Sequence, residues 1–422
     1  MLNLIPKDII NEIFDKLDIC QYYNITLCCK KFKTYCDNNP YFIYLNKNRK
    51  FISCGCNHTM IIKNYKLYAH GYNYYYQLGL PHITKYNPII PKPSIVPINK
   101  DIISVSCGQN HTIVITTEGT YSFGCNLYGQ LGVSWSEHDY REHKINIQNV
   151  MSVSCGETHN LLLTKNGIYS FGNNVHGELG LGHNNTLFTP TNIPFFLQFF
   201  NPYLIPLMNN KVPIASISCG YSHSMVIINN NLYGFGNNTD WQLGFKNKNP
   251  HKPNYKTPQL ITSMGNQHYI EVSCGFAHTM VLTLNGLYGF GRNSHGQLGI
   301  STITNYNIPE KVNLDHVISV KCGSTHTTAL TSNGFYVFGD NYFGQLGTKT
   351  FHTSCIPQKI KFNDNITFSV NYMNCGDHHT IVYGKNRNKN EKYYVFGQNK
   401  FNQLGLGPYK NKKYNKPQLL NF

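Results

Sequence analysis

The sequence predicts an all-β fold, a seven-bladed β-propeller of four-stranded blades, preceded by a small α-helical N-terminal segment. A Cys-Gly-x-x-His block occurs seven times, and each occurrence is followed by a Gly-x-Asn-x-x-x-(Gln/Glu)-Leu-Gly block. The blocks recur every 48 to 64 residues, a period typical of propeller blades rather than of helical solenoids. The cysteines that mark the units are Cys54, Cys107, Cys155, Cys219, Cys274, Cys322 and Cys375.

The unit around Cys107 shows how a repeat forms a blade. Residues 103–107 alternate apolar and small polar side chains, which predicts a first strand. The β-branched run 111–116 predicts a second strand, and residues 121–123 predict a third. Each of these strands is followed by glycine-containing turns.

Segments that contain proline complete most units and predict the fourth strand. Because proline has no N–H to donate, it occurs in a strand at the edge of a sheet or at the first residue of a strand. These segments include 257–261, 308–312, 356–360 and 416–420. Asn-Gly pairs at 166–167, 285–286 and 333–334 favour two-residue hairpins with positive φ at both central positions.

The two ends of the repeat array are expected to share one blade. The segment 416–420 has no unit after it, and the first unit at Phe51 has no such segment before it. We therefore expect a propeller over residues 51–422 that is closed by the C-terminal strand near 416–422. Closure of this kind removes two free sheet edges.

Composition favours an intracellular protein, cytoplasmic or nuclear or both. The chain has 422 residues and 14 cysteines, and charged residues near Met1 interrupt any signal-peptide pattern, so we expect reduced thiols. The longest apolar stretch, 194–208, contains Gln, Asn and Pro, and no membrane segment is expected. The net charge of +16 favours an acidic partner, although the abundance of Asn, Lys, Tyr and Ile also fits coding by an AT-rich genome.

The repeated Cys and His residues have the spacing of metal ligands, but they belong to neighbouring blades around a ring. A zinc site needs four convergent ligands. We therefore expect small buried thiols, and histidine rings that hydrogen-bond to neighbouring backbone, with no metal and no cofactor. The asparagines of the second block are expected to satisfy the backbone of turns.

Three features depart from the repeat and are candidates for partner contacts. Tyr76, Trp241 and Asn402 replace the glycine before Gln-Leu-Gly, which indicates either a changed turn or an aromatic contact. An insertion at 191–211 is rich in aromatic residues, which either bind a partner or pack on the propeller. A basic insertion lies at 384–392. The candidate contacts are Tyr76, Trp241, Phe195, Phe196, Phe199, Phe200, Lys385, Arg387 and Lys389.

Residues 1–50 lack the repeat and change period. Their apolar residues recur at three- and four-residue intervals, as in an amphipathic helix, and Pro6 stands where a first helical turn tolerates proline. A second apolar group at 22–28 precedes basic residues, so two or three short helices are expected.

These patterns resemble two families. The repeat resembles that of the regulator of chromosome condensation, whose members form seven-bladed β-propellers. The string from Leu4 to Leu17, with Cys29-Lys30-Lys31-Phe32, resembles an F-box, although Phe32 replaces the more common Trp. The F-box resemblance implies docking on a Skp1-like adaptor of a cullin ubiquitin ligase; the alternative is packing against the propeller. The implied contacts are Leu4, Pro6, Ile9, Ile10, Ile13, Phe14 and Leu17.

The first functional hypothesis is a protein-interaction scaffold, not an enzyme. It is the substrate receptor of an SCF-type ubiquitin ligase, whose propeller binds an unknown protein target on one face. The sequence contains no Walker loop and no nucleophile elbow. One alternative is guanine-nucleotide exchange on a small GTPase, although the repeats lack the wedge-like insertion of the best-known relative. The other is binding to chromatin or nucleic acid through the basic propeller.

Overall fold

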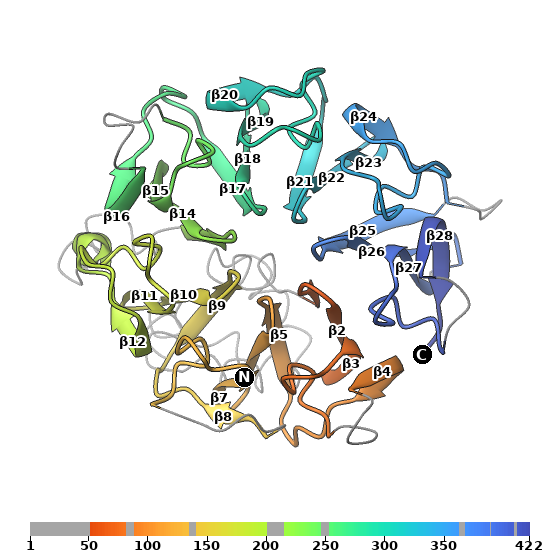
Figure 1. The fold of residues 1–422 in the computed structure, drawn as a ribbon, viewed down its shortest axis with the longest axis horizontal. Helices are drawn as coiled ribbons and strands as arrows, with labels where there is room; N and C mark the ends of the chain where they lie inside the picture. Colours follow the sequence, from red (N-terminus) through yellow and green to blue (C-terminus); the bar gives the residue numbers. More distant parts are fainter. Residues whose placement is uncertain are drawn as a thin grey trace, which may run out of the picture.

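Seven antiparallel sheets of four strands surround a central axis in the computed structural model (Figure 1). The structure describes residues 51–81, 88–134, 141–200, 215–245, 253–362, 368–388, 390–408 and 412–422. The predicted all-β fold and the number of blades are confirmed. The predicted helices of residues 1–50 lie outside the described residues.

In every blade the strands follow chain order, from the axis to the periphery (Figure 1). Blades 1 and 2 consist of β1 (Ile52–Cys54), β2 (His58–Lys63), β3 (Lys66–Tyr72), β4 (Ile89–Ile95) and of β5 (Ile102–Cys107), β6 (His111–Thr116), β7 (Gly119–Gly124), β8 (His143–Lys144). Blades 3 and 4 consist of β9 (Val150–Cys155), β10 (His159–Thr164), β11 (Gly167–Gly172), β12 (Leu187–Asn192) and of β13 (Ala215–Cys219), β14 (His223–Ile228), β15 (Asn231–Asn237), β16 (Asn254–Leu260).

The remaining blades repeat this order. Blades 5 and 6 consist of β17 (Tyr269–Cys274), β18 (His278–Thr283), β19 (Gly286–Gly291), β20 (Tyr306–Lys311) and of β21 (Val317–Cys322), β22 (His326–Thr331), β23 (Gly334–Gly339), β24 (Ser354–Lys359). Blade 7 consists of β25 (Ser369–Cys375), β26 (His379–Lys385), β27 (Glu391–Gln398) and β28 (Lys413–Leu420). A short 3-10 helix, η2 (Pro194–Phe200), follows blade 3.

The fourth strands lie at the sheet edges, as the prolines predict. Pro258, Pro309, Pro357 and Pro417 all lie in the outermost strand of their blade. An edge strand loses least by the missing N–H, because one of its sides has no ladder to complete.

The hairpin turns at the Asn-Gly pairs lie one residue earlier in the chain than predicted. Thr164 pairs with Gly167, so Lys165 and Asn166 are the central residues, and the glycine, with φ of 153°, follows the turn. Thr164 Oγ1 fixes this turn, because it accepts a bond from Asn166 N at 3.1 Å and donates to Gly167 O at 3.0 Å. Positive φ at both central positions occurs instead at 64–65 and 229–230.

The hydrophobic core is divided among the seven seams between blades. Each core cluster in the described residues joins two neighbouring blades. The third strand of blades 2 to 7 contributes a fully buried phenylalanine, such as Phe171. The last glycine of the preceding blade lies on that ring, and a Cβ at Gly132 would lie 2.8 Å from Phe171. The final glycine of each block therefore brings adjacent blades into close contact.

The prediction that the chain ends share a blade is wrong. β28 pairs with β27 of its own unit, and β4 pairs with β3. The first unit contains its own proline-bearing outer strand, so every blade takes all four strands from one unit. Side chains close the ring instead, because the Phe422 ring lies 5.2 Å from that of Tyr68 in blade 1 and 4.9 Å from that of Tyr393 in blade 7.

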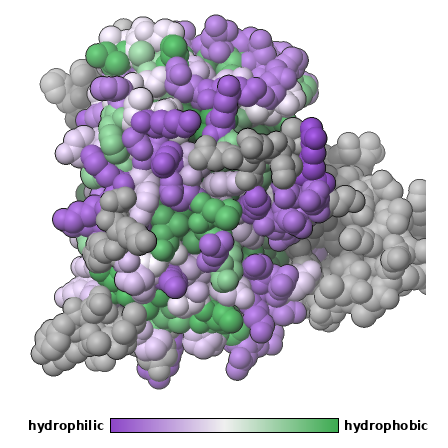
Figure 2. All heavy atoms as spheres, turned by 90° about the vertical axis from the view of Figure 1, so that its right-hand side faces the viewer, coloured by the Kyte–Doolittle hydropathy of each residue, from purple (hydrophilic) through white to green (hydrophobic). Residues whose placement is uncertain are grey.

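Figure 2 shows the side of the ring that carries the last blades, where hydrophobic side chains lie between hydrophilic ones. Exposed apolar residues of the outer strands include Ile308, Ile356 and Leu419. Over the ranges that the structure describes, no helix is long and apolar enough to cross a membrane.

Candidate functional site

The repeated cysteines connect the first strands of neighbouring blades around the axis. Cys107 N donates to Ser53 Oγ at 2.9 Å, and Cys107 Sγ donates to Ser53 O at 3.4 Å. Equivalent N–H bonds to serine occur for Cys155, Cys219, Cys274 and Cys322. Sequence analysis missed this role of serine, although a Ser-Cys dipeptide occurs in five units.

The repeated histidines form a second, complete ring of contacts. The Nε2 atom of each contacts a side chain in the second strand of the next blade, as between His278 and Thr327 Oγ1 at 3.1 Å, and the series closes between His379 and Thr59. Thr327 Oγ1 itself donates to Gln297 O at 2.7 Å. The hydroxyl must therefore accept from Nε2–H, which leaves Nδ1 without a proton and, in the structure, without a partner.

Burial holds these imidazoles neutral. It lowers the pKa of His58, His159, His223, His278 and His326 to about 3. The predicted structural role of Cys and His is confirmed, but the histidines bond to side chains of the next blade and not to neighbouring backbone. Among the described residues, no group of three or more His, Cys, Asp or Glu is arranged to hold a metal ion.

The asparagines of the second block satisfy turn backbone, as predicted. Asn126 Oδ1 accepts from Leu131 N at 3.0 Å, and Asn293 Nδ2 donates to Thr302 O at 2.9 Å. Blade 3 has Glu178 where the other blades have Gln. Its buried carboxylate accepts from His176 N at 2.7 Å, and burial raises the pKa of Glu178 to about 7.

An axial channel of about 400 Å³ runs between the first strands of the blades. Its lining includes the residue that directly follows each Cys-Gly pair, and these residues form a ring at one mouth. The ring consists of Cys56, Gln109, Glu157, Tyr221, Phe276, Ser324 and Asp377. Sequence analysis missed this ring. The sequence feature that could have revealed it is that the residue after each Cys-Gly pair differs from unit to unit, whereas the residues around it repeat.

One side of this mouth combines a carboxylate with aromatic rings. Gln109 Nε2 donates to Glu157 Oε1 at 2.8 Å, and the rings of Tyr221 and Phe276 lie 4.1 Å apart. Burial raises the pKa of Glu157 to about 7, and burial with the neighbouring Glu157 raises that of Tyr221 to about 12. Burial and Asp377 also raise the pKa of Cys56, so its thiol is protonated at neutral pH and is a poor nucleophile.

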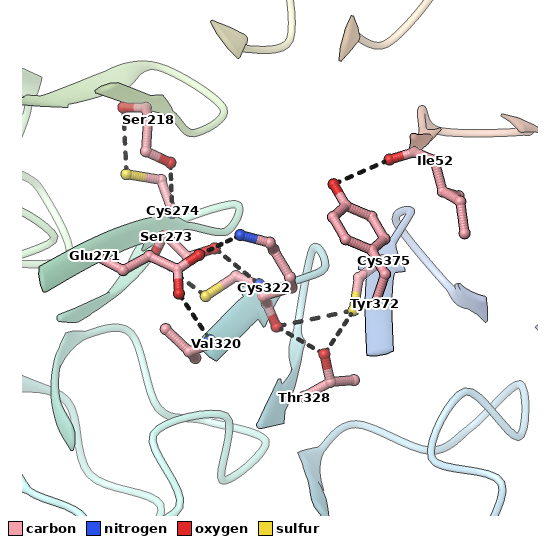
Figure 3. A network of polar contacts seen from close by, with 11 residues as sticks. Ile52, Ser218, Glu271, Ser273, Cys274, Val320, Cys322, Thr328, Tyr372 and Cys375 are labelled. Carbon is pink, nitrogen blue, oxygen red and sulfur yellow. Dashed lines mark hydrogen bonds and ion pairs between the residues drawn. The ribbon is translucent and has the colours of Figure 1, made fainter. Parts of the chain in front are cut away.

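Inside the channel a polar network spans blades 4 to 1 (Figure 3). Glu271 and Lys321 form an ion pair, and Val320 N donates to Glu271 Oε2 at 3.1 Å. Burial alone would lower the pKa of Lys321, but Glu271 raises it, so the amine stays charged. Tyr372 points across the blade 7–1 seam, and its hydroxyl donates to Ile52 O at 3.5 Å (Figure 3). All these polar groups have partners within the channel wall.

The structure places Tyr76 and Trp241 in ordinary turns, so the expectation of a changed turn is wrong. Their φ angles are 62° and 63°, close to the 74° of Gly129 at the same position of blade 2. In all three turns the residue accepts a bond from the last glycine of the block, at 2.9 to 3.0 Å. Both aromatic side chains are half-buried. Their contact with a partner stays a prediction.

The aromatic insertion packs mainly against the propeller. Phe196 and Phe200 of η2 are buried in the core cluster of blades 3 and 4, and Phe196 lies 5.7 Å from the Tyr233 ring. The prediction that these two rings contact a partner is therefore wrong, because the short helix turns them inward. Phe199 packs partly against the same cluster, and Phe195 is 37% exposed.

The basic insertion lengthens a hairpin of blade 7. Lys385 pairs with Glu391 in the sheet register, and its Nζ lies 3.5 Å from the carboxylate of that residue. Arg387 is exposed. Lys389 lies outside the described residues, as do the predicted adaptor contacts Leu4, Pro6, Ile9, Ile10, Ile13, Phe14 and Leu17.

The repeats match a known family over most of the chain. The Regulator of chromosome condensation (RCC1) repeat matches residues 66–115, 165–227, 229–282, 285–330 and 333–383. A second description of this repeat matches residues 102–130, 150–178, 269–297 and 317–345. The chain belongs to the RCC1 repeat family. The F-box domain family matches residues 2–44, which also confirms the second resemblance.

Curated relatives share the repeats within longer proteins. The chain is 39% identical over 241 residues to the probable E3 ubiquitin-protein ligase HERC4 of Rattus norvegicus, covering 56% of this chain and 21% of that protein. It is 33% identical over 326 residues to the human X-linked retinitis pigmentosa GTPase regulator, covering 65% of this chain and 31% of that protein. The chain thus spans about a fifth to a third of these relatives.

A solved structure agrees in fold. Prp20p from Saccharomyces cerevisiae matches with a TM-score of 0.71 and 21% identity, over 91% of this chain and 90% of that chain. This likeness supports the RCC1-type propeller architecture.

Proposed function

We propose that this chain is a protein-interaction scaffold that acts as the substrate receptor of an SCF-type ubiquitin ligase. Residues 1–50 bind a Skp1-like adaptor, and the propeller binds the protein target. The observation that carries the proposal is the match of an F-box to residues 2–44 in the same chain as an RCC1 propeller. One chain with both modules can hold an adaptor and a target together without catalysing a reaction itself.

The use of the motif residues supports a binding role for the propeller. Its repeated cysteines and histidines are engaged in contacts between blades, and burial keeps the histidines neutral. The Cys56 thiol at the channel mouth is protonated, which disfavours nucleophilic catalysis there. We therefore propose that the chain is not itself an enzyme and that other ligase subunits transfer ubiquitin.

The relatives support a link to ubiquitination, and the cysteines support an intracellular location. One relative is named a probable E3 ubiquitin-protein ligase, which associates the repeats with ubiquitination in that protein. The cysteines that the structure describes are free, as expected in a reducing compartment. We propose an intracellular location on this ground.

A pull-down of the purified full-length chain with a Skp1-type adaptor tests the proposal. The parent protein should bind, and the variant Ile9→Asp with Phe14→Asp should lose binding, because both changes place charge on the predicted apolar stripe. The matched control, Lys7→Asp with Lys16→Asp, introduces the same carboxylates at polar positions and should retain binding.

Far-ultraviolet circular dichroism checks that all three proteins keep the propeller. Absence of binding by the folded parent would contradict the proposal. Equal binding by both double variants would show that the stripe is not the adaptor surface.

A further inference from the structure

Lysine and aromatic side chains gather on one face of the propeller, across blades 6, 7 and 1. In every blade the third strand ends and the fourth begins at the same face, because the strands alternate in direction and follow chain order. The side chains of this group come from those connections and the strand ends beside them. We call the group the lysine-aromatic arc; it consists of Phe351, Lys413, Tyr342, Lys400, Phe401, Tyr72 and Tyr74.

Direct contacts link the arc across both seams. Lys413 of β28 lies over two rings of blade 6, with Nζ 4.3 Å from the Phe351 centroid and 4.9 Å from the Tyr342 centroid. At the next seam the Phe401 ring of blade 7 lies 4.8 Å from that of Tyr72 in blade 1. Tyr72 in turn stacks on Tyr74, with centroids 6.2 Å apart.

The arc is exposed to an unusual degree for large apolar groups. Tyr342 is 66% exposed, Tyr74 is 56% exposed and Phe351 is 42% exposed. Exposed apolar residues scattered singly need no explanation, but rings gathered on adjacent blades of one face are typical of a binding surface. Aromatic anchors also contribute most of the energy at such surfaces.

The charge around the arc selects the partner. The three connections between third and fourth strands contain three lysines in the parts that the structure describes, Lys349, Lys400 and Lys412. Those parts are residues 340–353 in blade 6, 399–408 with 412 in blade 7, and 73–81 with 88 in blade 1. The only acidic residue in those parts is Asp340, which is 7% exposed and accepts from Gln345 Nε2 at 2.9 Å. The surface is therefore positive between its aromatic rings.

We infer that the lysine-aromatic arc binds an acidic peptide segment that carries aromatic or leucine side chains, in a partner protein. Carboxylates pair with the lysines, and the apolar side chains pack on the exposed rings. The identity of that partner as the ligase target rests on the proposed function; the binding itself does not.

A peptide fits the arc better than a nucleic acid does. A nucleic-acid backbone requires a row of free cations for its phosphates. The described arc contains two lysines, Lys400 and Lys413, and no arginine, fewer cations than the roughly 6–10 phosphate contacts of a typical nucleic-acid interface.

Selection from a display library of random peptides of about 12 residues, with the full-length chain as bait, tests the inference. The expected consensus places Asp or Glu beside Phe, Tyr, Trp or Leu. A labelled peptide with that consensus is then titrated by fluorescence anisotropy. Tyr74→Ser with Tyr342→Ser, and separately Lys400→Glu with Lys413→Glu, should each weaken binding at least about tenfold.

The matched control is Leu284→Ser, which removes a side chain that is 71% exposed in a hairpin of the opposite face and should leave the affinity unchanged. Circular dichroism checks the fold of each variant. Selection without an acidic and apolar consensus, or equal affinity of the arc variants and the parent, would overturn the inference. So would tighter arc-dependent binding of an oligothymidylate of about 20 nucleotides.

The same variants separate this inference from the proposed function. Both arc variants should still bind the Skp1-type adaptor. If the parent binds the acidic peptide but not the adaptor, only the ligase proposal fails; if it binds the adaptor but selects no acidic peptide, only the arc fails.

Discussion

Acid should unfold this propeller at a higher pH than most proteins of its size, because eight of the histidines that the structure describes are buried and neutral. The seven ring histidines each donate through Nε2 and have a buried Nδ1 without a partner, and His70 is fully buried beside the backbone of Gln403. The pKa of His70 is lowered to about 3, and that of His111 to about 4. A proton added to any of these rings would therefore create a buried positive charge without water around it, which destabilises the folded state.

Proton binding by these histidines lowers the free energy of unfolding as the pH falls. Because the folded pKa values are lowered, the unfolded chain takes up protons first as pH falls below about 6.5, and stability that is fully present above that pH is lost. Each histidine then costs about 0.8 kcal/mol at pH 6 and about 2 kcal/mol at pH 5. Eight such groups cost about 7 and about 16 kcal/mol, against a typical total stability of roughly 5–15 kcal/mol.

The buried Glu178 acts in the opposite direction but is too weak to compensate. Since its pKa is raised, protonation in the folded state returns about 1 kcal/mol at pH 6 and about 2.5 kcal/mol at pH 5. Glu157 contributes with the same sign, reduced by its solvent exposure. The net effect predicts an acid transition between about pH 5 and pH 6.

Urea unfolding followed by circular dichroism from pH 8 to pH 5, at constant ionic strength, measures this dependence. His70→Phe serves as the matched variant, since blades 2 to 7 have phenylalanine at that position. It should be at least as stable as the parent at pH 8, because a buried polar ring is replaced by the apolar ring of the other blades, and should lose about an eighth of the pH dependence. A parent stability that changes by less than about 2 kcal/mol between pH 8 and pH 6 would refute the reasoning.

Four further substitutions test the packing that the structure shows. Phe196→Ala should cost about 3–5 kcal/mol in urea unfolding, since the ring is fully buried; a cost below about 1 kcal/mol would contradict its place in the core. Gly344→Ala should cost about 2 kcal/mol or more, because φ is +83° and the new Cβ would lie 2.6 Å from Tyr414 O. Trp241→Gly at the equivalent position of blade 4 should change stability by less than about 1 kcal/mol, and an equal loss in both turns would refute this comparison. Phe422→Ala should lower the thermal midpoint, since that ring joins blades 7 and 1; an unchanged midpoint would show that the seam closes without it.

The lysine-aromatic arc and the channel mouth show where sequence reasoning reached its limit. Tyr74 and Tyr342 belong to repeated blocks that sequence analysis interpreted as structural turns, and Lys413 begins a strand. Only the ring arrangement brings Lys413 of the last blade over Tyr342 of the one before it. A surface built from equivalent positions of successive blades has no local signature in any one unit.

The sequence by itself determined the number of blades, the order of strands within each and the structural character of Cys, His and Asn. It did so because each blade takes four strands from one unit, so that local periodicity and turn residues describe the whole sheet. Tertiary structure alone decided how the ring closes, which aromatic rings turn inward and which partner each histidine bonds. These contacts join residues in different units, as between Phe422 and Tyr68 or His379 and Thr59, and burial and distance across a seam are properties of the packed molecule rather than of the chain.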